Sequence, residues 1–423
     1  MKLIIHRGTH QIGGSCVELA GSGGRLVLDL GLPLPGAGDA PSSADPREAG
    51  LLPKILGLYA DDEPGVTALV LSHAHPDHYG LADYVHPAIP VFAGKGTAAL
   101  LEASRIFLPK SPVGRCLSLL PKGQPVSIGP FTVTGYLVDH SAPDALALLV
   151  EGEGRRVFYS GDLRGHGRKA ALFARLLQEP PENVDCLLLE GTMLGRSAQA
   201  IPDERAVEAA LVDVFRQKIG PALIFCSSQN LDRLVSIYRA VKRSGCLLVI
   251  DLYTAYVLRA LRVLSDSIPQ FDWPLVRVKY WKYHADCLVK AGKRDFLYEV
   301  RPAKIEMEEI GQRGLEVVML AKSNRLLPVL ADHLPTTDTL ELIWSMWPGY
   351  LTGDDVVSRF CAARGLQLRH IHTSGHAPTE DLQRLVRAIR PKQLVPIHTF
   401  ERERYKDLFD NVRMTEDGEE IQL

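Results

Sequence analysis

Short apolar runs bounded by turns recur along this chain and predict buried β-strands. The N-terminal region is rich in them, with runs at residues 2–6, 16–20 and 25–30 separated by Gly-rich turns. Later runs of the same character occupy residues 66–71, 131–137, 157–159, 187–189 and 394–397. Most of these later runs are followed within a few residues by a histidine or a carboxylate, so the strand ends carry the candidate chemistry.

Helical patterns lie between the later strands. Residues 231–242 form a predicted helix between strands at 222–226 and 246–251, and the three elements make a βαβ unit. Leu382, Leu385, Val386 and Ile389 form an apolar stripe at helical spacing. Because 423 residues are too many for one hydrophobic core, the pattern predicts an α/β protein of two domains.

The densest polar cluster follows the strand at 66–71. Four metal-capable side chains, His73, His75, Asp77 and His78, fall within six residues in the pattern His-x-His-x-Asp-His. Imidazoles and carboxylates are ligands that suit zinc or manganese. The alternative is a solvated polar turn, but ordinary turns are rich in Gly, Asn and Ser rather than in histidine.

Three further candidate ligands also follow predicted strands. His140 comes after the run at 131–137, Asp162 after 157–159, and His398 after 394–397. Taken alone, His140 is as easily a structural residue as a ligand, and Ser-Gly-Asp162 is an ordinary turn sequence. Their order behind the first cluster favours convergence on one edge of a sheet, where α/β proteins place their sites.

The composition and net charge limit the classes of protein to which this chain can belong. Hydrophobic residues make up 46% and charged residues 23%, as in a globular enzyme, and the net charge of −2 provides no global attraction for nucleic acid. A local positive charge that could attract nucleic acid does exist, since residues 277–294 hold six Lys or Arg and one Asp. A nucleic-acid surface and a solvated basic face explain this segment equally well. The seven cysteines include no CxxC pair, and no leader or apolar run of membrane length occurs, so we expect a cytoplasmic protein without membrane contact.

The His-x-His-x-Asp-His motif after a strand resembles the signature of the metallo-β-lactamase fold hydrolases. The resemblance implies two zinc ions, with manganese as the alternative. It assigns His73, His75, His140 and Asp162 to one metal, and Asp77, His78, Asp162 and His398 to the other. Asp29, at the end of the third N-terminal strand, matches an aspartate that braces the metal loop in this family.

The long segment between Asp162 and His398 resembles the β-CASP insertion. Glu190 matches its acidic motif and Ser374-Gly375-His376 its Ser-Gly-His motif, and the whole chain is most similar to ribonuclease J. The resemblance implies a metallo-β-lactamase αββα sandwich at residues 1–195 and 350–423, with a β-CASP α/β domain inserted at 196–349. It implies hydrolysis of RNA phosphodiester bonds by a metal-activated hydroxide.

Within that chemistry the family pattern suggests roles for particular residues. Asp77 orients the hydroxide, His376 donates to a phosphoryl oxygen, and Glu190 orients His376 or a ligand. Ser374 and Gly375 offer backbone N–H groups to a phosphate. The expected RNA contacts are Ser228, Asn230, Arg233, Lys279 and Lys282.

Some features depart from the family or stay open. The stretch Gln229-Asn230-Leu231-Asp232-Arg233 replaces a Ser-Asn-Val-His-Arg-like motif, and Ser345–Tyr350 keeps only the Pro-Gly of the usual segment. By family analogy His398 favours RNA over DNA, with single-stranded RNA as the expected substrate. A DNA nuclease, a small-molecule metallo-hydrolase and a non-catalytic scaffold are the alternatives. Endonuclease or 5′-exonuclease action, protein partners and oligomeric state are left open by the sequence.

Overall fold

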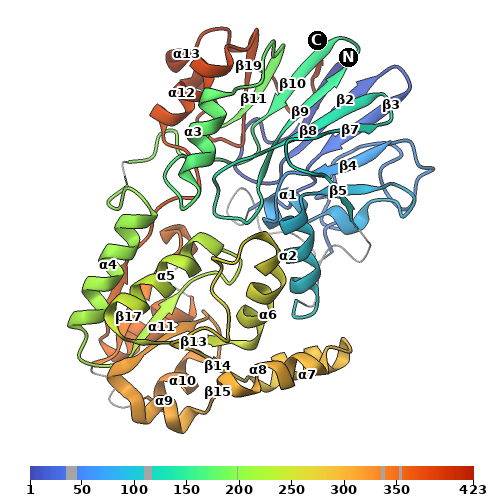
Figure 1. Cartoon of the computed structure of the whole chain (residues 1–423). Coiled ribbons are helices and arrows are strands. Elements are labelled where there is room, and N and C mark those ends of the chain that lie inside the picture. The colour runs from blue at the N-terminus through green and yellow to red at the C-terminus, as the bar shows by residue number, and fades with distance from the viewer. Residues whose placement is uncertain (35–44, 109–116, 198, 335–338, 352–354) are drawn as a thin grey trace. The chain divides into compact units, whose positions relative to one another are not determined.

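The computed structural model of the chain, shown in Figure 1, describes residues 1–34, 45–108, 117–197, 199–334, 339–351 and 355–423. It divides into two compact units. The first comprises Met1–Arg105, Lys110–Ser197 and Gly375–Leu423, and the second comprises Ile106–Pro109 and Ala198–Ser374. The second unit is therefore inserted into the chain of the first, as the sequence predicts.

The first unit contains two β-sheets in its described residues. One has seven strands in the order β20-β1-β2-β3-β4-β5-β6, and the other has six in the order β19-β11-β10-β9-β8-β7. The strands of the first sheet are β1 (Lys2–Arg7), β2 (Cys16–Gly21), β3 (Gly24–Leu28), β4 (Ala68–Leu71), β5 (Val91–Ala93), β6 (Ser118–Leu119) and β20 (Glu420–Gln422). Those of the second are β7 (Pro125–Ile128), β8 (Phe131–Leu137), β9 (Leu146–Gly152), β10 (Arg155–Tyr159), β11 (Cys186–Glu190) and β19 (Gln393–Ile397).

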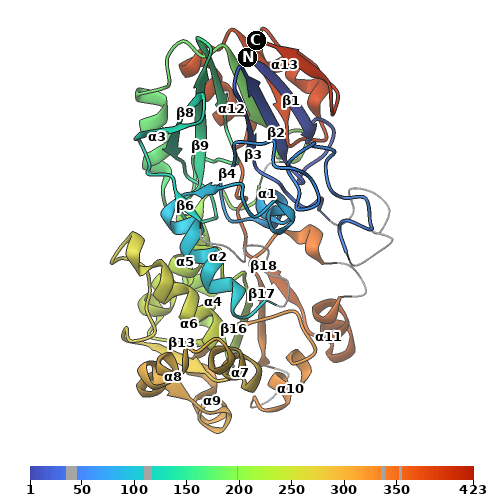
Figure 2. The ribbon, with the colours of Figure 1, turned by 90° about the vertical axis from the view of Figure 1, so that its right-hand side faces the viewer.

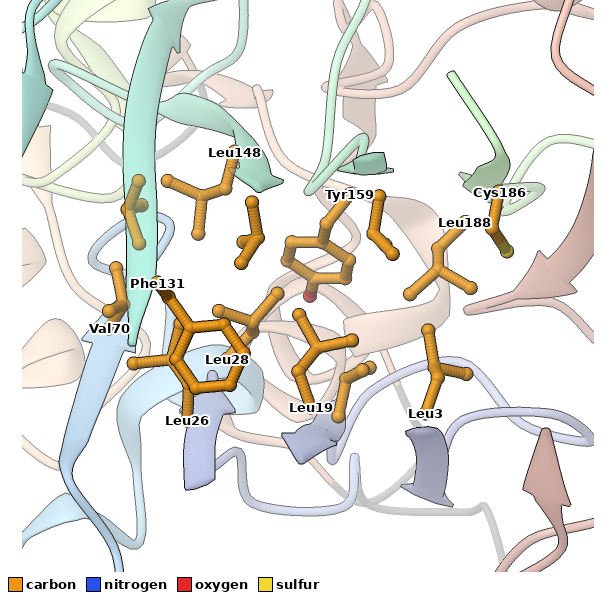
Figure 3. Packing of buried hydrophobic residues seen from close by; sticks show 14 of the residues in the cluster. Leu3, Leu19, Leu26, Leu28, Val70, Phe131, Leu148, Tyr159, Cys186 and Leu188 are labelled. Atoms are coloured by element: carbon orange, nitrogen blue, oxygen red, sulfur yellow. The ribbon is translucent and has the colours of Figure 1, made fainter. Parts of the chain in front are cut away.

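The two sheets share a buried apolar core. Figure 3 shows Leu19 and Leu28 of one sheet directed toward Leu148, Tyr159 and Leu188 of the other. Close packing of such side chains supplies most of the stability of a two-layer core. The tight apposition also fixes how the ends of the two sheets lie beside each other, and those ends carry the histidines and aspartates.

Helices α3 (Ala170–Gln178) and α12 (Thr379–Ile389) cover the outer face of the second sheet. The predicted stripe of Leu382, Leu385 and Ile389 is buried there against apolar side chains of the sheet and of α3. Three more helices belong to this unit, namely α1 (Pro76–Tyr79), α2 (Lys95–Arg105) and α13 (Tyr405–Leu408). The predicted fold class, a metallo-β-lactamase sandwich carrying an inserted α/β domain, is confirmed.

The second unit is built on a parallel sheet of seven described strands in the order β15-β14-β13-β16-β12-β17-β18. They are β12 (Ala222–Phe225), β13 (Leu247–Asp251), β14 (Val276–Lys279), β15 (Lys304–Ile305), β16 (Val317–Ala321), β17 (Glu341–Trp344) and β18 (Leu368–His370). Its helices are α4 (Glu204–Gln217), α5 (Leu231–Ser244), α6 (Leu252–Leu261), α7 (Lys282–Lys290), α8 (Arg294–Val300), α9 (Met307–Arg313), α10 (Leu327–Asp332) and α11 (Val356–Arg364). The predicted βαβ unit is present as β12-α5-β13, although β16 lies between its two strands.

The second boundary of the insertion differs from the sequence prediction. The chain returns to the first unit at residues 374–375 rather than at 349–350. Residues 350–374 stay with the second unit because β18 pairs in parallel with β17 at the edge of its sheet.

Within the described residues, no helix combines the length and the apolar character that crossing a membrane requires.

Candidate metal centre

Both sheets of the first unit end beside one cluster of histidines and aspartates. His73 and His75 follow β4, while Asp77 and His78 lie on α1 immediately afterwards. His140, Asp162 and His398 follow β8, β10 and β19 of the second sheet. The seven side chains predicted as ligands are thus brought together by strand ends that lie far apart in sequence.

One half of the cluster combines His73, His75, His140 and Asp162, whose candidate ligand atoms all lie within 4.8 Å of one another. His75 Nδ1 is 3.1 Å from His73 Nε2 and 3.1 Å from His140 Nε2. Asp162 Oδ2 is 3.6 Å from His73 Nε2 and 3.9 Å from His140 Nε2. Three nitrogens and a carboxylate oxygen at these separations can surround one ion.

The other half combines Asp77, His78, Asp162 and His398 within the same 4.8 Å limit. His78 Nε2 is 3.2 Å from Asp162 Oδ2, and His398 Nε2 is 3.3 Å from Asp77 Oδ2. Asp162 belongs to both halves, so its carboxylate could contribute to both ligand sets. These are the two sets that the family resemblance implies.

Four imidazoles are held by a partner on the nitrogen that faces away from the cluster. Nδ1 of His140 donates to the Gly375 carbonyl at 2.6 Å, and Nδ1 of His398 is 2.8 Å from Thr192 Oγ1. His73 Nδ1 is 3.0 Å from Ser72 Oγ, and His78 Nδ1 is 2.7 Å from Asp29 Oδ2. A proton on Nδ1 leaves Nε2 with its lone pair toward the cluster, which is the tautomer a metal ligand needs.

Asp29 is the centre of this supporting layer. Its fully buried carboxylate accepts hydrogen bonds from the Ser72 N–H at 2.7 Å and the Ser72 hydroxyl at 2.6 Å, as well as from Tyr159 at 2.6 Å and His78 at 2.7 Å. Its φ of 57° lies in the left-handed region, as does the 51° of His398. Strained backbone of this kind persists where the surroundings fix it, and it is enriched at functional sites. The brace that the resemblance assigns to Asp29 has its structural counterpart here.

The electrostatics of the cluster favour ionised carboxylates and neutral imidazoles at His73, His75 and His140. His78 differs, because burial lowers its pKa but the carboxylates of Asp162 and Asp29 outweigh burial and raise it. Burial lowers the pKa of His73 and His140, and lowers that of His75 to about 4. Burial alone raises the pKa of Asp77, but the hydrogen bond from His398 and the charge of His78 outweigh it and bring it to about 2. A ligand must be a neutral imidazole or an ionised carboxylate to bind a cation.

His376 and Glu190 adjoin the cluster. His376 Nδ1 is 3.3 Å from Glu190 Oε1 and 3.8 Å from Asp162 Oδ2, and its side chain is 20% exposed. Glu190 is fully buried and also accepts the Thr192 N–H at 3.0 Å. Burial lowers the pKa of His376, but the carboxylates of Glu190 and Asp162 outweigh burial and raise it. The ring is therefore oriented by Glu190 and still reaches solvent.

Two buried atoms show that the residues present fit a metal. His78 Nε2 and Asp162 Oδ1 are buried without a hydrogen-bond partner among the described residues, and both belong to the cluster. Buried polar atoms are almost always satisfied, so an unsatisfied pair in a set of zinc-type ligands indicates a site for a cation. The donor set therefore suits metal binding.

The predicted RNA contacts in the second unit are placed differently from one another. Arg233 is fully buried, pairs with Glu204 at 2.9 Å and donates to the Ser345 carbonyl at 2.6 Å, so it does not present its guanidinium to a ligand. Asn230 caps α5 by accepting the Arg233 N–H. In this structure the polar groups of these two residues serve the fold, and a direct RNA contact by either stays a prediction.

The other predicted contacts differ in exposure, and of Ser228, Lys279 and Lys282 it is Lys282 that is open to solvent. Ser228 is buried at the end of β12 and bonds Thr254 and Lys322. Lys279 is 8% exposed and lies 3.4 Å from Glu306, whereas the Lys282 side chain is 88% exposed and pairs with Asp286 at 2.6 Å. The Ser374 N–H donates to Gln199 Oε1, and the Gly375 carbonyl accepts from His140. The phosphate cradle expected at these two residues stays a prediction.

Sequence reasoning missed several supporting residues, among them Tyr159, Thr192 and Ser72. Each is an ordinary strand-end or turn residue whose importance comes from a contact with a distant segment. Ser72, adjacent to His73, is the only one of the three with a local signal.

Comparisons with known proteins agree with this geometry. The model of the beta-lactamase superfamily domain matches residues 50–213, and that of the Zn-dependent metallo-hydrolase RNA specificity domain matches residues 363–415. A solved structure, described as a protein of unknown function from Enterococcus faecalis, superposes with a TM-score of 0.78 at 24% identity and covers 100% of this chain and 99% of that one. At that identity the likeness shows the fold.

Among curated proteins, the chain is similar to ribonuclease J of Sinorhizobium meliloti, with 25% identity over 88% of this chain and 63% of the relative. It is also similar to ribonuclease J of Mycobacterium tuberculosis, with 26% identity over 92% of this chain and 67% of the relative. The chain thus spans about two thirds or less of the length of these relatives. Together with the two-sheet fold and the histidine–aspartate cluster, these matches support the resemblance to the metallo-β-lactamase superfamily and, within it, to proteins of the β-CASP, ribonuclease J-like type.

Proposed function

We propose that this chain is a metal-dependent ribonuclease that hydrolyses phosphodiester bonds of single-stranded RNA. The observation that carries the proposal is the convergence of seven metal-type ligands with the Glu190–His376 pair at one end of the two sheets. The RNA specificity domain match and the ribonuclease J relatives support RNA over DNA as the substrate. A lactam or thioester hydrolase is less favoured, because neither comparison points to such a substrate.

In this proposal two zinc ions, or manganese ions in their place, are held by the two halves of the cluster. The first would be held by His73, His75, His140 and Asp162, and the second by Asp77, His78, Asp162 and His398. Bound metal ions supply Lewis acidity toward water and toward the phosphodiester oxygens. The number and identity of the ions are part of the proposal.

The chain's own residues would position the reactants. The free directions of the Asp77 carboxylate accept a hydrogen bond from the attacking water and orient it. His376, steered by Glu190, donates a hydrogen bond to a phosphoryl oxygen, a type of contribution worth roughly 10²–10⁴ in rate. The buried walls of the site exclude bulk water, which strengthens each of these interactions.

The test is a digestion of labelled single-stranded RNA, the matching single-stranded DNA, nitrocefin and a thioester, with and without EDTA. We expect EDTA-sensitive cleavage of RNA, and co-purified zinc or manganese by elemental analysis. Substrates with a 5′-phosphate and a 5′-hydroxyl show whether cleavage is internal or begins at the 5′ end. Faster hydrolysis of DNA or of the small substrates, or RNA cleavage that Asp77→Asn leaves intact, contradicts the proposal.

A further inference from the structure

Two exposed aromatic side chains stand just beyond β17 in the second unit. Trp347 and Tyr350 are 43% and 55% exposed, and their rings meet edge to face with centroids 5.3 Å apart and planes at 88°. Large exposed aromatic groups usually mark a binding surface, since burying them in a complex releases much apolar area. They lie in the Ser345–Tyr350 segment, where this sequence departs from its family.

The turn that carries the pair is firmly built. The Trp344 indole N–H donates to the Trp347 carbonyl at 3.2 Å, and the Tyr350 and Leu351 N–H groups close the turn onto Trp347 and Pro348. Gly349 lies beneath the indole, where an added Cβ would be only 2.2 Å from ring atom Cη2 of Trp347. The Trp347 indole thus packs directly over Gly349, and this contact orients the ring in the absence of a ligand.

The position of the turn in the sheet points to a ligand. All seven strands are parallel, and β17 and β18 run side by side (Figure 2), so the residues after each strand share one edge. Open parallel sheets bind ligands at this carboxyl edge. Lys322 and Arg325 follow β16 at the same edge, two strand spacings or roughly 10 Å from β17. The Lys322 ammonium donates to the Cys226 carbonyl at 3.3 Å and to Ser228 Oγ at 2.5 Å, whereas Arg325 is exposed. Aromatic faces beside cations are the chemistry that binds single-stranded nucleic acid.

We propose that Trp347 and Tyr350 form a stacking subsite for an unpaired base of single-stranded RNA, with the sugar-phosphate chain following the carboxyl edge of the sheet toward Arg325. The proposal rests on the ribonuclease function proposed above and adds a binding residue pair to it. A nucleobase of any sequence presents an apolar face to the indole, while the phosphates of the same strand follow the edge toward the exposed Arg325.

The affinity of short single-stranded RNA, measured by fluorescence anisotropy in EDTA so that no cleavage occurs, tests the subsite. Trp347→Ala should raise Kd by roughly 5- to 150-fold, the range for loss of one stacked base, with a smaller rise for Trp347→Phe and Tyr350→Ala. Gly349→Ala deletes neither ring but displaces the indole, so it should weaken binding in the same direction. Ile219→Ala and Leu315→Ala remove exposed apolar groups just before β12 and β16, at the amino edge, and should leave Kd unchanged.

An RNA series with one abasic position at each step identifies the stacked base. In the wild type, one abasic position should weaken binding about as much as Trp347→Ala does, and that penalty should vanish in Trp347→Ala. Equal Kd for wild type and Trp347→Ala, with both folded by circular dichroism, overturns the stacking subsite while RNA binding by the wild type keeps the proposed function. Equal losses in the amino-edge controls also overturn it. A wild type that neither binds nor cleaves RNA refutes the ribonuclease proposal itself.

Discussion

Replacing Asp29 by Asn tests how the metal cluster is supported. The substitution keeps size, and Asn tolerates the left-handed φ of 57°. Oδ2 accepts three hydrogen bonds, from Ser72 Oγ, Tyr159 and His78, whereas Oδ1 accepts the Ser72 N–H. The amide of the variant has one oxygen. In its best placement that oxygen keeps the hydrogen bonds from Ser72 Oγ, Tyr159 and His78, and the NH₂ group then faces the Ser72 N–H, which loses its acceptor.

The cost follows from these contacts. One buried donor loses its partner, which costs about 1–3 kcal/mol, and three bonds to a charged acceptor become weaker neutral ones at about 1 kcal/mol each. We therefore expect Asp29→Asn to lower the free energy of unfolding by about 4–6 kcal/mol. Zinc affinity should fall by roughly 10- to 100-fold, since His78 loses the acceptor that fixes its ring.

Two measurements separate local from general damage. All four tryptophans, at 273, 281, 344 and 347, belong to the second unit, so tryptophan fluorescence follows its unfolding and circular dichroism follows both units. Urea unfolding should therefore show the loss in the dichroism signal, and a competing chelator reports zinc affinity. Asp144→Asn is a matched control, because Asp144 also has a positive φ and its carboxylate accepts the Gly96 N–H at 2.7 Å. If Asp29→Asn changes stability and zinc affinity no more than the control does, the supporting role is refuted.

Three further substitutions give independent tests. His376→Gln should lower RNA turnover by roughly 10²–10⁴-fold with unchanged zinc content, and an equal loss of zinc would make His376 a ligand instead. Arg233→Met leaves Glu204 buried without its cation and should cost about 3–5 kcal/mol in the fluorescence transition; normal stability with weakened RNA binding would support the predicted RNA contact. Burial raises the pKa of Glu18, but hydrogen bonds from His6 and Arg25 outweigh it and lower it to about 2. Its stabilisation of about 3 kcal/mol is therefore present above pH 4.5 and lost as the pH falls toward 2, and Glu18→Gln should flatten acid unfolding in that range.

The convergence of the seven predicted ligands could be foreseen because its signal is local. Each follows a recognisable apolar strand, and parallel strand ends meet at one edge, so the sequence alone is enough to group His140, Asp162 and His398. Whether a polar side chain is buried, by contrast, cannot be read from its neighbours in the sequence. Arg233 and Asn230 have the residue types of RNA contacts, but the register of α5 turns Arg233 inward to Glu204 and makes Asn230 a helix cap. Residues 35–44 and Cys116 lie outside the part of the chain that the structure describes.

The domain boundary shows the same distinction. Pro348 and Gly349 end β17 in a turn, and a turn is a natural place to end a domain in a sequence. The chain instead makes α11 and one further strand, whose edge pairing with β17 depends on the completed sheet rather than on any residue of that strand. Pairing at the edge of a sheet depends on tertiary structure, so the sequence pattern of β18 alone does not predict it.

The supporting layer explains why so many segments are needed for one cluster. A buried carboxylate without a cation is costly, and Asp77, Asp162, Asp29 and Glu190 all lie buried within or next to a ring of imidazoles. Hydrogen bonds satisfy Asp29 internally, whereas Asp162 keeps an oxygen, and His78 a nitrogen, without a hydrogen-bond partner among the described residues. The fold thus satisfies the carboxylate that orients His78, and it leaves these two atoms of the cluster without a partner. Because bound cations satisfy these two atoms, metal binding should be coupled to the stability of the first unit.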